Sequence, residues 1–323
     1  MIEAHAVFGA LADPTRLRIL LLVRELELAM GELAEVLGQS QPRVSRHVRI
    51  LAEAGLVRRH REGAWVFVRA GALTDSGRLL AFASELFNGE DPILADRARL
   101  AQVRADRQRL ADAWFAEHAD EWDHMRALQG DDGATEARLS ALARARGIGR
   151  LLDIGTGTAR VLALLAEDAE AATGIDRSPE MLRLARAKLD GLGLGHVEVR
   201  QADMAALPFA AASFDTVVMH QVLHFAADPQ AAIREAARVL APDGQLILVD
   251  YARHDHEELR ARFRHLRLGF ASADIVRWLR DAGLRACAED EQAGPALTVK
   301  LWQAVAPGAA AHRQRACAER IEA

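Results

Sequence analysis

Apolar residues recur at helical spacing within the first fifty positions of the chain. Asp13 and Pro14 mark a helix start, because a carboxylate can cap the helix and the first turn does not need the N–H that proline lacks. The apolar face predicted for this helix consists of Leu17, Leu20, Leu21 and Leu26. A second short helix is predicted over residues 31–37, and Gly38 supplies the turn after it.

A third helix follows, with Ser40 as its predicted cap. Val44, Val48 and Leu51 stand at positions i, i+4 and i+7, so we expect them to face the core. Residues 56–61 and 64–69 then predict two strands joined by a tight turn. This order of elements predicts a winged helix-turn-helix domain, mainly α with a β-hairpin wing.

The outer face of the third helix and the predicted wing are polar and mostly basic. The candidate contacts to double-stranded DNA are Ser40, Gln41, Arg43, Ser45, Arg46, His47 and Arg49 on the helix, and Arg58, Arg59 and Arg61 on the wing. From residue 41 to residue 69, seven arginines stand against two glutamates, a net charge of +5 that suits contact with phosphates. The alternative is a solvated arginine face on a small helical domain.

From residue 147 onward, apolar runs typical of strands alternate with amphipathic helices. Strands are predicted over 150–154, 171–176, 196–200, 214–219 and 244–250, helices over 179–190 and 228–240, and an antiparallel edge hairpin over 285–289 and 296–305. This alternation predicts a second, C-terminal domain with a Rossmann-like, seven-stranded α/β sheet.

The first of these strands runs into a glycine-rich turn. Gly155 allows a sharp turn, and Gly157 allows close approach of the backbone to a ligand because it has no Cβ. Ala159 stands where the longer nucleotide fingerprint has a third glycine, which is a mild departure from that pattern. The next strand ends at Asp176, about 20 residues beyond the glycines, where a carboxylate can accept hydrogen bonds from ribose hydroxyls.

The stretch between these regions is polar, rich in arginine and helical in pattern. Its apolar stripe consists of Leu100, Val103, Leu110 and Trp114, continued by Trp122, Met125 and Leu128. It predicts one long helix or two, which either pack on a domain or form a dimer interface as well. The expected organisation is a DNA-binding domain over 1–88, a helical connector over 89–146, an α/β domain over 147–306 and a flexible tail over 307–323.

Composition narrows the classes of function. The 323 residues carry a formal charge of −5, and no apolar run approaches the roughly 20 residues that span a bilayer. The first residues do not read as a signal peptide, so we expect a cytoplasmic protein that does not enter a membrane. Cys287 and Cys317 cannot form a cysteine-rich metal site, and no metal ligands are predicted.

The segment from Asp13 to Leu20, and Gln39-Ser40-Gln41 with Val44-Ser45-Arg46-His47-Val48, resemble ArsR/SmtB-type repressors over residues 5–85. The resemblance implies a homodimer that leaves its DNA operator when an inducer binds. Metal-sensing members carry two cysteines where this chain has Ala29 and Gly31. Without thiolates, sensing of arsenite or soft metals at that position is excluded.

The glycine turn, followed by Gln201-Ala202-Asp203-Met204 and Ser213-Phe214-Asp215, resembles class I S-adenosylmethionine-dependent methyltransferases over residues 147–306. By that resemblance, Asp153, Gly155, Thr156 and Gly157 hold the amino-acid part of an S-adenosyl ligand. Asp176 holds the ribose, Asp203 and Met204 lie at adenine, and His220 lies near the sulfonium. Arg177 is a further candidate contact to the ligand.

The whole arrangement resembles SahR-type regulators, in which a methyltransferase-like domain is fused to an ArsR-type domain. This implies a regulator, acting as a repressor, that senses S-adenosylhomocysteine or S-adenosylmethionine and controls methionine-cycle genes. The alternative is an active small-molecule methyltransferase with an autoregulatory DNA-binding domain, and a third interpretation is a protein–protein adaptor. His220, His224, Tyr251, His254, Asp255 and His256 fall on or after strand ends, but they form no diagnostic pair in the sequence, so no catalytic residue is assigned.

Overall fold

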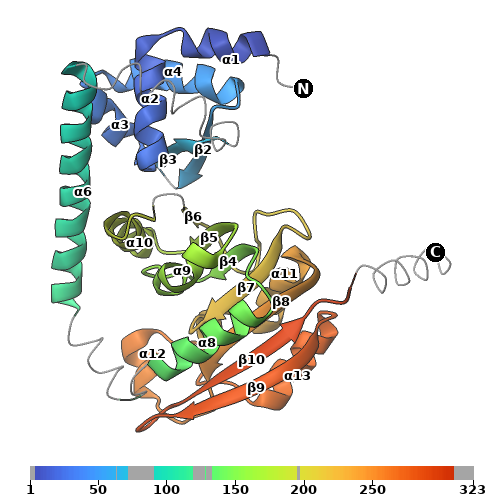
Figure 1. Cartoon of the computed structure of the whole chain (residues 1–323). Coiled ribbons are helices and arrows are strands. Elements are labelled where there is room, and N and C mark those ends of the chain that lie inside the picture. Colours follow the sequence, from blue (N-terminus) through green and yellow to red (C-terminus); the bar gives the residue numbers. More distant parts are fainter. Residues whose placement is uncertain are drawn as a thin grey trace. The chain divides into compact units, whose positions relative to one another are not determined.

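The computed structural model describes residues 4–62, 64–71, 91–118, 128, 133–194 and 197–308. The chain forms two compact units (Figure 1). One comprises Met1–Ala111 with Ala187–His196, and the other comprises Asp112–Arg186 with Val197–Ala323. The predicted connector is divided between them, since Ala111 ends the first stretch of one unit and Asp112 begins the other.

The first unit contains a helical core and a small sheet. Its helices are α1 (Ala4–Leu11), α2 (Pro14–Glu25), α3 (Met30–Leu37) and α4 (Gln41–Glu53), and its strands are β1 (Leu28–Ala29), β2 (Val57–Glu62) and β3 (Trp65–Ala70). The predicted winged helix-turn-helix elements are all present. The sheet order is β1-β3-β2, so a two-residue strand that the apolar pattern did not indicate completes the wing. The predicted turn residue Gly63 lies outside the described residues.

Two details of these helices differ from the prediction. The buried residues of α2 include Ile19, Leu20, Leu22 and Val23, whereas Leu17 and Leu21 are only half-buried. The reason is that α2 contacts α3, α4 and β3, so neighbours on several sides select a broader, rotated face. Asp13 caps α2 by accepting a hydrogen bond from the Arg16 amide. Ser40 occupies the cap position of α4 but forms no capping hydrogen bond through its side chain.

Helix α6 (Asp91–Glu117) runs without a break for 27 residues. Leu100 and Val103 join the core of the winged helix, as predicted, but Leu110 is 64% exposed and Ala111 is buried in its place. The buried stripe of α6 also contains Asp96, which an apolar pattern cannot reveal. Trp122 and Met125 lie outside the described residues.

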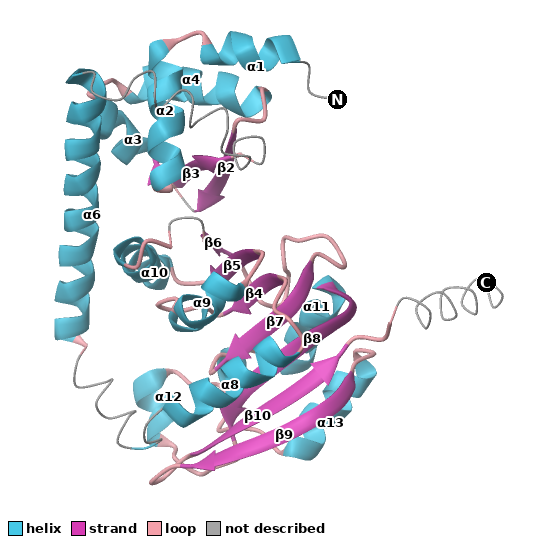
Figure 2. Cartoon of the chain, viewed as in Figure 1, coloured by secondary structure: helices cyan, strands magenta, loops and turns pink. Residues whose placement is uncertain are grey.

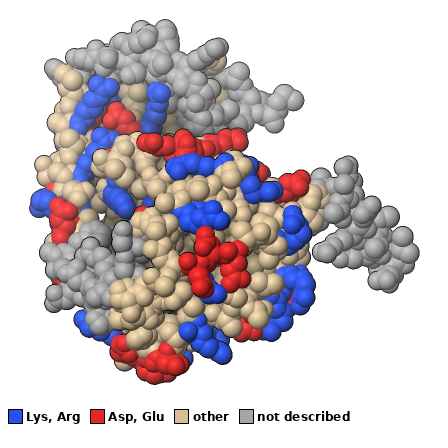
Figure 3. Space-filling view, turned by 60° about the horizontal axis from the view of Figure 1, so that its bottom comes forward, with Lys and Arg blue, Asp and Glu red and all other residues tan. Residues whose placement is uncertain are grey.

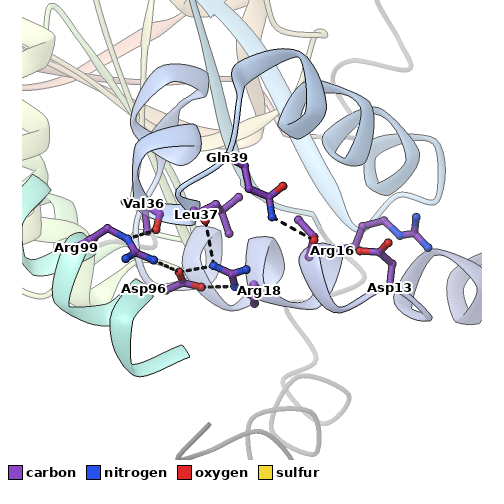
Figure 4. Close-up of polar contacts among 9 residues, drawn as sticks. Asp13, Arg16, Arg18, Val36, Leu37, Gln39, Asp96 and Arg99 are labelled. Atoms are coloured by element: carbon purple, nitrogen blue, oxygen red, sulfur yellow. Dashed lines mark hydrogen bonds and ion pairs between the residues drawn. The ribbon is translucent and has the colours of Figure 1, made fainter. Parts of the chain in front are cut away.

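Asp96 fastens α6 to the winged helix. Its carboxylate, 2% exposed, accepts two hydrogen bonds of 2.6 Å from Arg18 of α2 and one of 2.9 Å from Arg99 of α6 (Figure 4). The same guanidinium groups donate to the carbonyls of Leu37 and Val36 at the end of α3. Both arginines thus lie at the C-terminal end of α3, where the helix dipole favours positive charge. Through these two arginines, Asp96 links α2, α3 and α6.

The second unit is built on a seven-stranded sheet of order β6-β5-β4-β7-β8-β10-β9. Its strands are β4 (Arg150–Ile154), β5 (Ala171–Asp176), β6 (Glu198–Gln201), β7 (Phe214–His220), β8 (Leu240–Tyr251), β9 (Arg285–Ala293) and β10 (Thr298–Val305). Strands β4 to β8 are parallel, and β9 and β10 form the antiparallel edge, as predicted.

Helices cover both faces of this sheet (Figure 2). They are α8 (Gly133–Ala145), α9 (Arg160–Leu165), α10 (Pro179–Gly191), α11 (Pro229–Val239), α12 (Glu258–Phe263) and α13 (Ser272–Asp281), with short 3-10 turns at Ala166–Asp168 and Leu223–Phe225. α8 and α9 contact each other on one face, and α11 and α13 do so on the other. Among the described helices, none combines the length and apolarity needed to cross a membrane.

Candidate ligand site and candidate nucleic-acid interface

The turn after β4 contains two glycines with different roles. Gly155 adopts φ +71°, and a Cβ added there would lie 2.1 Å from Cγ2 of Val222. Internal packing therefore requires glycine at this position. Gly157 adopts φ +52°, and a Cβ added there would have no atom within 4 Å. Among the described residues, the space beside Gly157 is open, and contact with a ligand there stays a prediction.

Ala159 ends the turn in the left-handed region, with φ 60° and ψ 39°. It is fully buried as the N-cap residue of α9. A left-handed conformation costs a residue with a Cβ roughly 1–2 kcal/mol. Alanine in place of the third glycine therefore costs conformational energy and is not the mild departure that the sequence pattern indicated, because the backbone conformation at this position favours glycine.

Asp153, at the end of β4, is the most perturbed carboxylate of the turn. It is 1% exposed, and its Oδ2 accepts a 2.7 Å hydrogen bond from the Thr156 hydroxyl. Its Oδ1 is buried and has no hydrogen-bond partner among the described residues. Burial, together with the nearby charge of Asp176, raises the pKa of Asp153 to about 7. A cation placed at Oδ1 would satisfy that oxygen and favour the ionised form.

Asp176, at the end of β5, lies beside the same turn. Its Oδ2 accepts a 3.0 Å hydrogen bond from the Gly157 amide, and its Oδ1 accepts one of 2.8 Å from the Ser178 amide. Burial raises the pKa of Asp176, and these backbone donors oppose that effect. A carboxylate can accept about four hydrogen bonds, so both oxygens retain capacity for ribose hydroxyls.

The remaining predicted ligand residues lie after neighbouring strands. Arg177 follows Asp176 and is exposed. Asp203 is exposed after β6, where its Oδ1 accepts a 2.9 Å hydrogen bond from the Ala205 amide. Met204 is half-buried against the core of the sheet. The structure thus bonds Asp153 to Thr156 and Asp176 to Gly157 within one turn, and places Arg177, Asp203 and Met204 after the ends of β5 and β6.

His220 ends β7, the neighbour of β4 on the other side. Its Nε2 is buried and has no partner among the described residues. Burial, reinforced by the positive charge of Arg160, lowers the pKa of His220 to about 4. The imidazole is therefore neutral at physiological pH and cannot repel a sulfonium.

A pair that sequence reasoning missed lies one strand further along the sheet. Nδ1 of His224 is 2.8 Å from Oδ1 of Asp250, and both side chains are buried. Asp250 comes at the end of β8, after an uninterrupted apolar run. The rule that picks out Asp176, a carboxylate at the end of a buried parallel strand, would also have found Asp250.

The candidate nucleic-acid interface is on α4 and the wing. Gln41, Arg43, Arg46 and Arg49 are exposed on α4, as are Ser40 before it and Arg58, Arg59 and Arg61 on β2. Val44, Val48 and Leu51 are fully buried, so the predicted division of the two faces is confirmed. An open groove separates the helix from the wing, with Gln41 and Ser45 on one side and Arg59 and Trp65 on the other.

His47 and Arg49 of the predicted set lie near acidic side chains of the protein. His47 is half-buried, and its Nδ1 lies 3.7 Å from Oδ1 of Asp13. Burial lowers the pKa of His47, which keeps this ring uncharged at neutral pH. Arg49 forms an exposed i,i+4 ion pair with Glu53 at 3.8 Å. Arg43, Arg46 and the wing arginines therefore supply most of the basic character of this surface.

Basic character is local rather than general. On the face of the molecule that Figure 3 presents, acidic and basic side chains are interspersed and form no broad field of one sign. Such an alternation fits the small formal charge of −5.

Comparison with known families supports both halves of this description. Residues 13–59 match the family model of bacterial regulatory proteins of the arsR family, and residues 152–248 match that of the methyltransferase domain. The chain joins an ArsR-family helix-turn-helix to a methyltransferase domain.

Individual relatives match one half or the other. The chain is 39% identical over 125 residues to phosphatidylethanolamine N-methyltransferase of Cereibacter sphaeroides, a match that spans 38% of this chain and 61% of that protein. It is 48% identical over 64 residues to the arsenical resistance operon repressor of Escherichia coli, which spans 20% of this chain and 55% of that protein. The chain thus covers less than two thirds of either relative. The crystal structure of the YcgJ protein of Bacillus subtilis aligns with a TM-score of 0.48 at 20% identity, over 54% of this chain and 99% of that one.

Proposed function

We propose that this chain is a transcriptional regulator, acting as a repressor, whose methyltransferase domain senses S-adenosylhomocysteine or S-adenosylmethionine. The observation that carries the proposal is the buried Oδ1 of Asp153, which has no partner among the described residues, in the same turn as Gly157, whose Cα side is open. The same chain presents an exposed arginine face on its winged helix.

The residues of the turn fit an S-adenosyl ligand. The ammonium of its amino-acid part would supply the cation that Oδ1 of Asp153 lacks. Asp176 would accept hydrogen bonds from the ribose hydroxyls, and the exposed Arg177 and Asp203 and the half-buried Met204 would border the nucleoside. The neutral ring of His220 would tolerate a sulfonium. When bound, S-adenosylmethionine supplies an electrophilic methyl group, whereas S-adenosylhomocysteine supplies none.

The winged helix would read an operator in the manner of other helix-turn-helix proteins. Ser40, Gln41 and Arg43 lie at the N-terminal end of α4, the part of a recognition helix that reaches base edges in the major groove. The exposed arginines of β2 would contact phosphates. We propose a cytoplasmic homodimer that binds two half-sites, with methionine-cycle genes as its targets.

Sensing requires that the ligand bind the DNA-competent and the released states with different affinity. A coupling free energy of about 1–3 kcal/mol would change the affinity for DNA by roughly 5- to 150-fold. A ligand that binds both states equally tightly would leave the affinity for DNA unchanged.

A second candidate is an active small-molecule methyltransferase whose winged helix serves autoregulation. The specific observation that favours it is the buried pair of His224 and Asp250, since a sensor does not need a paired imidazole.

Calorimetry with both S-adenosyl compounds tests the ligand site. We expect each to bind, and Asp176→Asn to weaken binding at least about tenfold, because it removes hydrogen bonds to a charged acceptor. Asp168→Asn is the matched control, since Asp168 pairs with Arg144 at 2.7 Å outside the turn. Absence of heat with both compounds, or equal binding by Asp176→Asn and wild type, would reject the proposal.

A further inference from the structure

The pair of His224 and Asp250 has the hydrogen bonds that fix one form of the imidazole. Oδ1 of Asp250 lies 2.8 Å from Nδ1 of His224 and accepts from the Tyr251 amide at 2.8 Å, while Oδ2 accepts from the His224 amide at 3.2 Å. An ionised carboxylate only accepts, so Nδ1 of His224 carries the proton. The lone pair of the ring is then on Nε2, as in a general base.

Two more histidines pack around this pair. The rings of His224 and His265 lie with centroids 4.0 Å apart, and Tyr251 stacks on His265 at 5.9 Å. His265 is 4% exposed, yet its Nδ1 has no hydrogen-bond partner among the described residues, and neither has Nε2 of His254. Burial lowers the pKa of His265 to about 3 and that of His254 below its usual value, so both rings are neutral.

The hydrogen bond of His254 determines which of its two ring nitrogens carries the proton. Its Nδ1 accepts a 3.3 Å hydrogen bond from the His256 amide. A neutral imidazole that accepts at one nitrogen carries its proton on the other, so Nε2 of His254 is a buried donor that lacks an acceptor. Buried polar atoms are nearly always satisfied, and an exception points to an absent partner. The cluster thus offers a lone pair on His224, an N–H on His254 and the Nδ1 of His265, which has no partner among the described residues.

The cluster also adjoins the proposed S-adenosyl site. Val222, two residues before His224, packs on Gly155 of the glycine turn. His220 pairs in register with Val249, which directly precedes Asp250. Phe225, 39% exposed and with its ring 4.2 Å from that of His224, brings the cluster to the surface.

We infer that this cluster binds a small hydroxylated aromatic compound and that His224 takes the proton of its hydroxyl during methyl transfer. The inference rests on the proposed S-adenosyl site. The hydroxyl O–H bond breaks, its proton goes to Nε2 of His224, and the oxygen keeps the electron pair and bonds to the methyl carbon of S-adenosylmethionine. The sulfur–methyl bond breaks with its electrons on sulfur, which gives S-adenosylhomocysteine.

The chemistry of the cluster selects a hydroxyl. A hydroxyl both donates and accepts, so it can donate to the lone pair of His224 or accept from the N–H of His254. An ammonium has no lone pair, and both oxygens of the one carboxylate are already engaged. Phe225, which is 39% exposed, offers an aromatic face to a planar ring.

The test uses the full-length chain saturated with S-adenosylhomocysteine, with phenol, catechol and 4-nitrophenol as probes. In wild-type protein labelled at histidine, we expect nitrogen NMR to show Nε2 of His224 unprotonated, and the phenols to shift the signals of His224 and His265. With labelled S-adenosylmethionine, methyl groups should pass to at least one phenol. Asp250→Asn removes the negative charge that stabilises a protonated His224, so it should slow transfer on the order of 10²- to 10⁴-fold, with unchanged binding of S-adenosylhomocysteine.

His256→Gln is the matched control, because that ring bonds Glu258 at 2.9 Å rather than Asp250, and it should transfer methyl groups as wild type does. If S-adenosylhomocysteine binds but the phenols move neither imidazole, or His224 carries its proton on Nε2, the inference is wrong. Calorimetry without phenols separates this result from failure of the S-adenosyl site. The NMR measurement on wild type decides the matter even if Asp250→Asn does not fold.

Discussion

Replacing Asp153 by asparagine should stabilise the protein at neutral pH while it weakens ligand binding. The folded state raises the pKa of Asp153 from 3.8 to about 7. Between these values the folded state binds a proton that the unfolded state has released, so wild-type stability falls as the pH rises from 4 to 7. Three units of pKa correspond to about 4 kcal/mol lost at pH 7. Asparagine does not ionise and avoids this loss.

The side-chain amide of the new asparagine reduces this gain in stability. Its NH₂ group would occupy the position of the unpartnered Oδ1, which costs about 1–3 kcal/mol. The net stabilisation expected at pH 7.5 is therefore about 1–3 kcal/mol, and it should be about 2 kcal/mol smaller at pH 5, where wild-type Asp153 is mostly protonated. Urea denaturation of both proteins at the two pH values measures this difference.

Ligand binding provides the complementary measurement. If an ammonium holds Asp153 ionised, wild-type affinity for S-adenosylhomocysteine should rise about tenfold from pH 6 to pH 8, because binding displaces a proton. Asp153→Asn should bind more weakly and lose this pH dependence, whereas Asp168→Asn should keep both properties. A stability gain that is equal at pH 5 and pH 7.5, or wild-type affinity in Asp153→Asn, would refute the reasoning.

Three further predictions concern other parts of the fold. Asp96→Asn should lower the free energy of unfolding by about 3–5 kcal/mol in urea denaturation, since it leaves Arg18 and Arg99 without their buried carboxylate. A loss below about 1 kcal/mol would contradict the role of Asp96 in holding α6 against the winged helix. Ala159→Gly should raise that free energy by about 1 kcal/mol, because glycine adopts the left-handed conformation without strain, and a destabilised variant would show that the methyl group is needed for packing. Arg46→Ala should weaken binding to DNA of any sequence and lower the slope of log affinity against log salt by about 1; an unchanged slope in fluorescence anisotropy would remove Arg46 from the interface.

Much of the fold could be predicted because its signals are local. The 3.6-residue period of Val44, Val48 and Leu51 separates the two faces of α4. Continuous apolar runs that end in glycine or a carboxylate locate the buried parallel strands. Asp176 was placed at the ligand turn for the same reason, since neighbouring parallel strands end at one edge of the sheet.

What could not be predicted depends on contacts between distant residues. Asp96 stands at a core position of α6 only because Arg18 and Arg99 neutralise it, and hydrophobic periodicity cannot anticipate that. Leu110 fits the apolar stripe by composition but is 64% exposed, whereas Ala111 next to it is buried, and the sequence does not show where the buried face of α6 turns. His224 lies in a short 3-10 turn 26 residues before Asp250, and no spacing rule joins such a histidine to a strand-end carboxylate.

The central claim is that an S-adenosyl ligand changes the affinity of the winged helix for DNA. The direct measurement is a titration of fluorescent operator DNA with the full-length protein, without ligand and at saturating S-adenosylhomocysteine or S-adenosylmethionine. The account predicts that at least one ligand shifts the dissociation constant by roughly 5- to 150-fold, and that DNA shifts the affinity for that ligand by the same factor. Identical titration curves in all three conditions, with ligand binding confirmed by calorimetry, would contradict it.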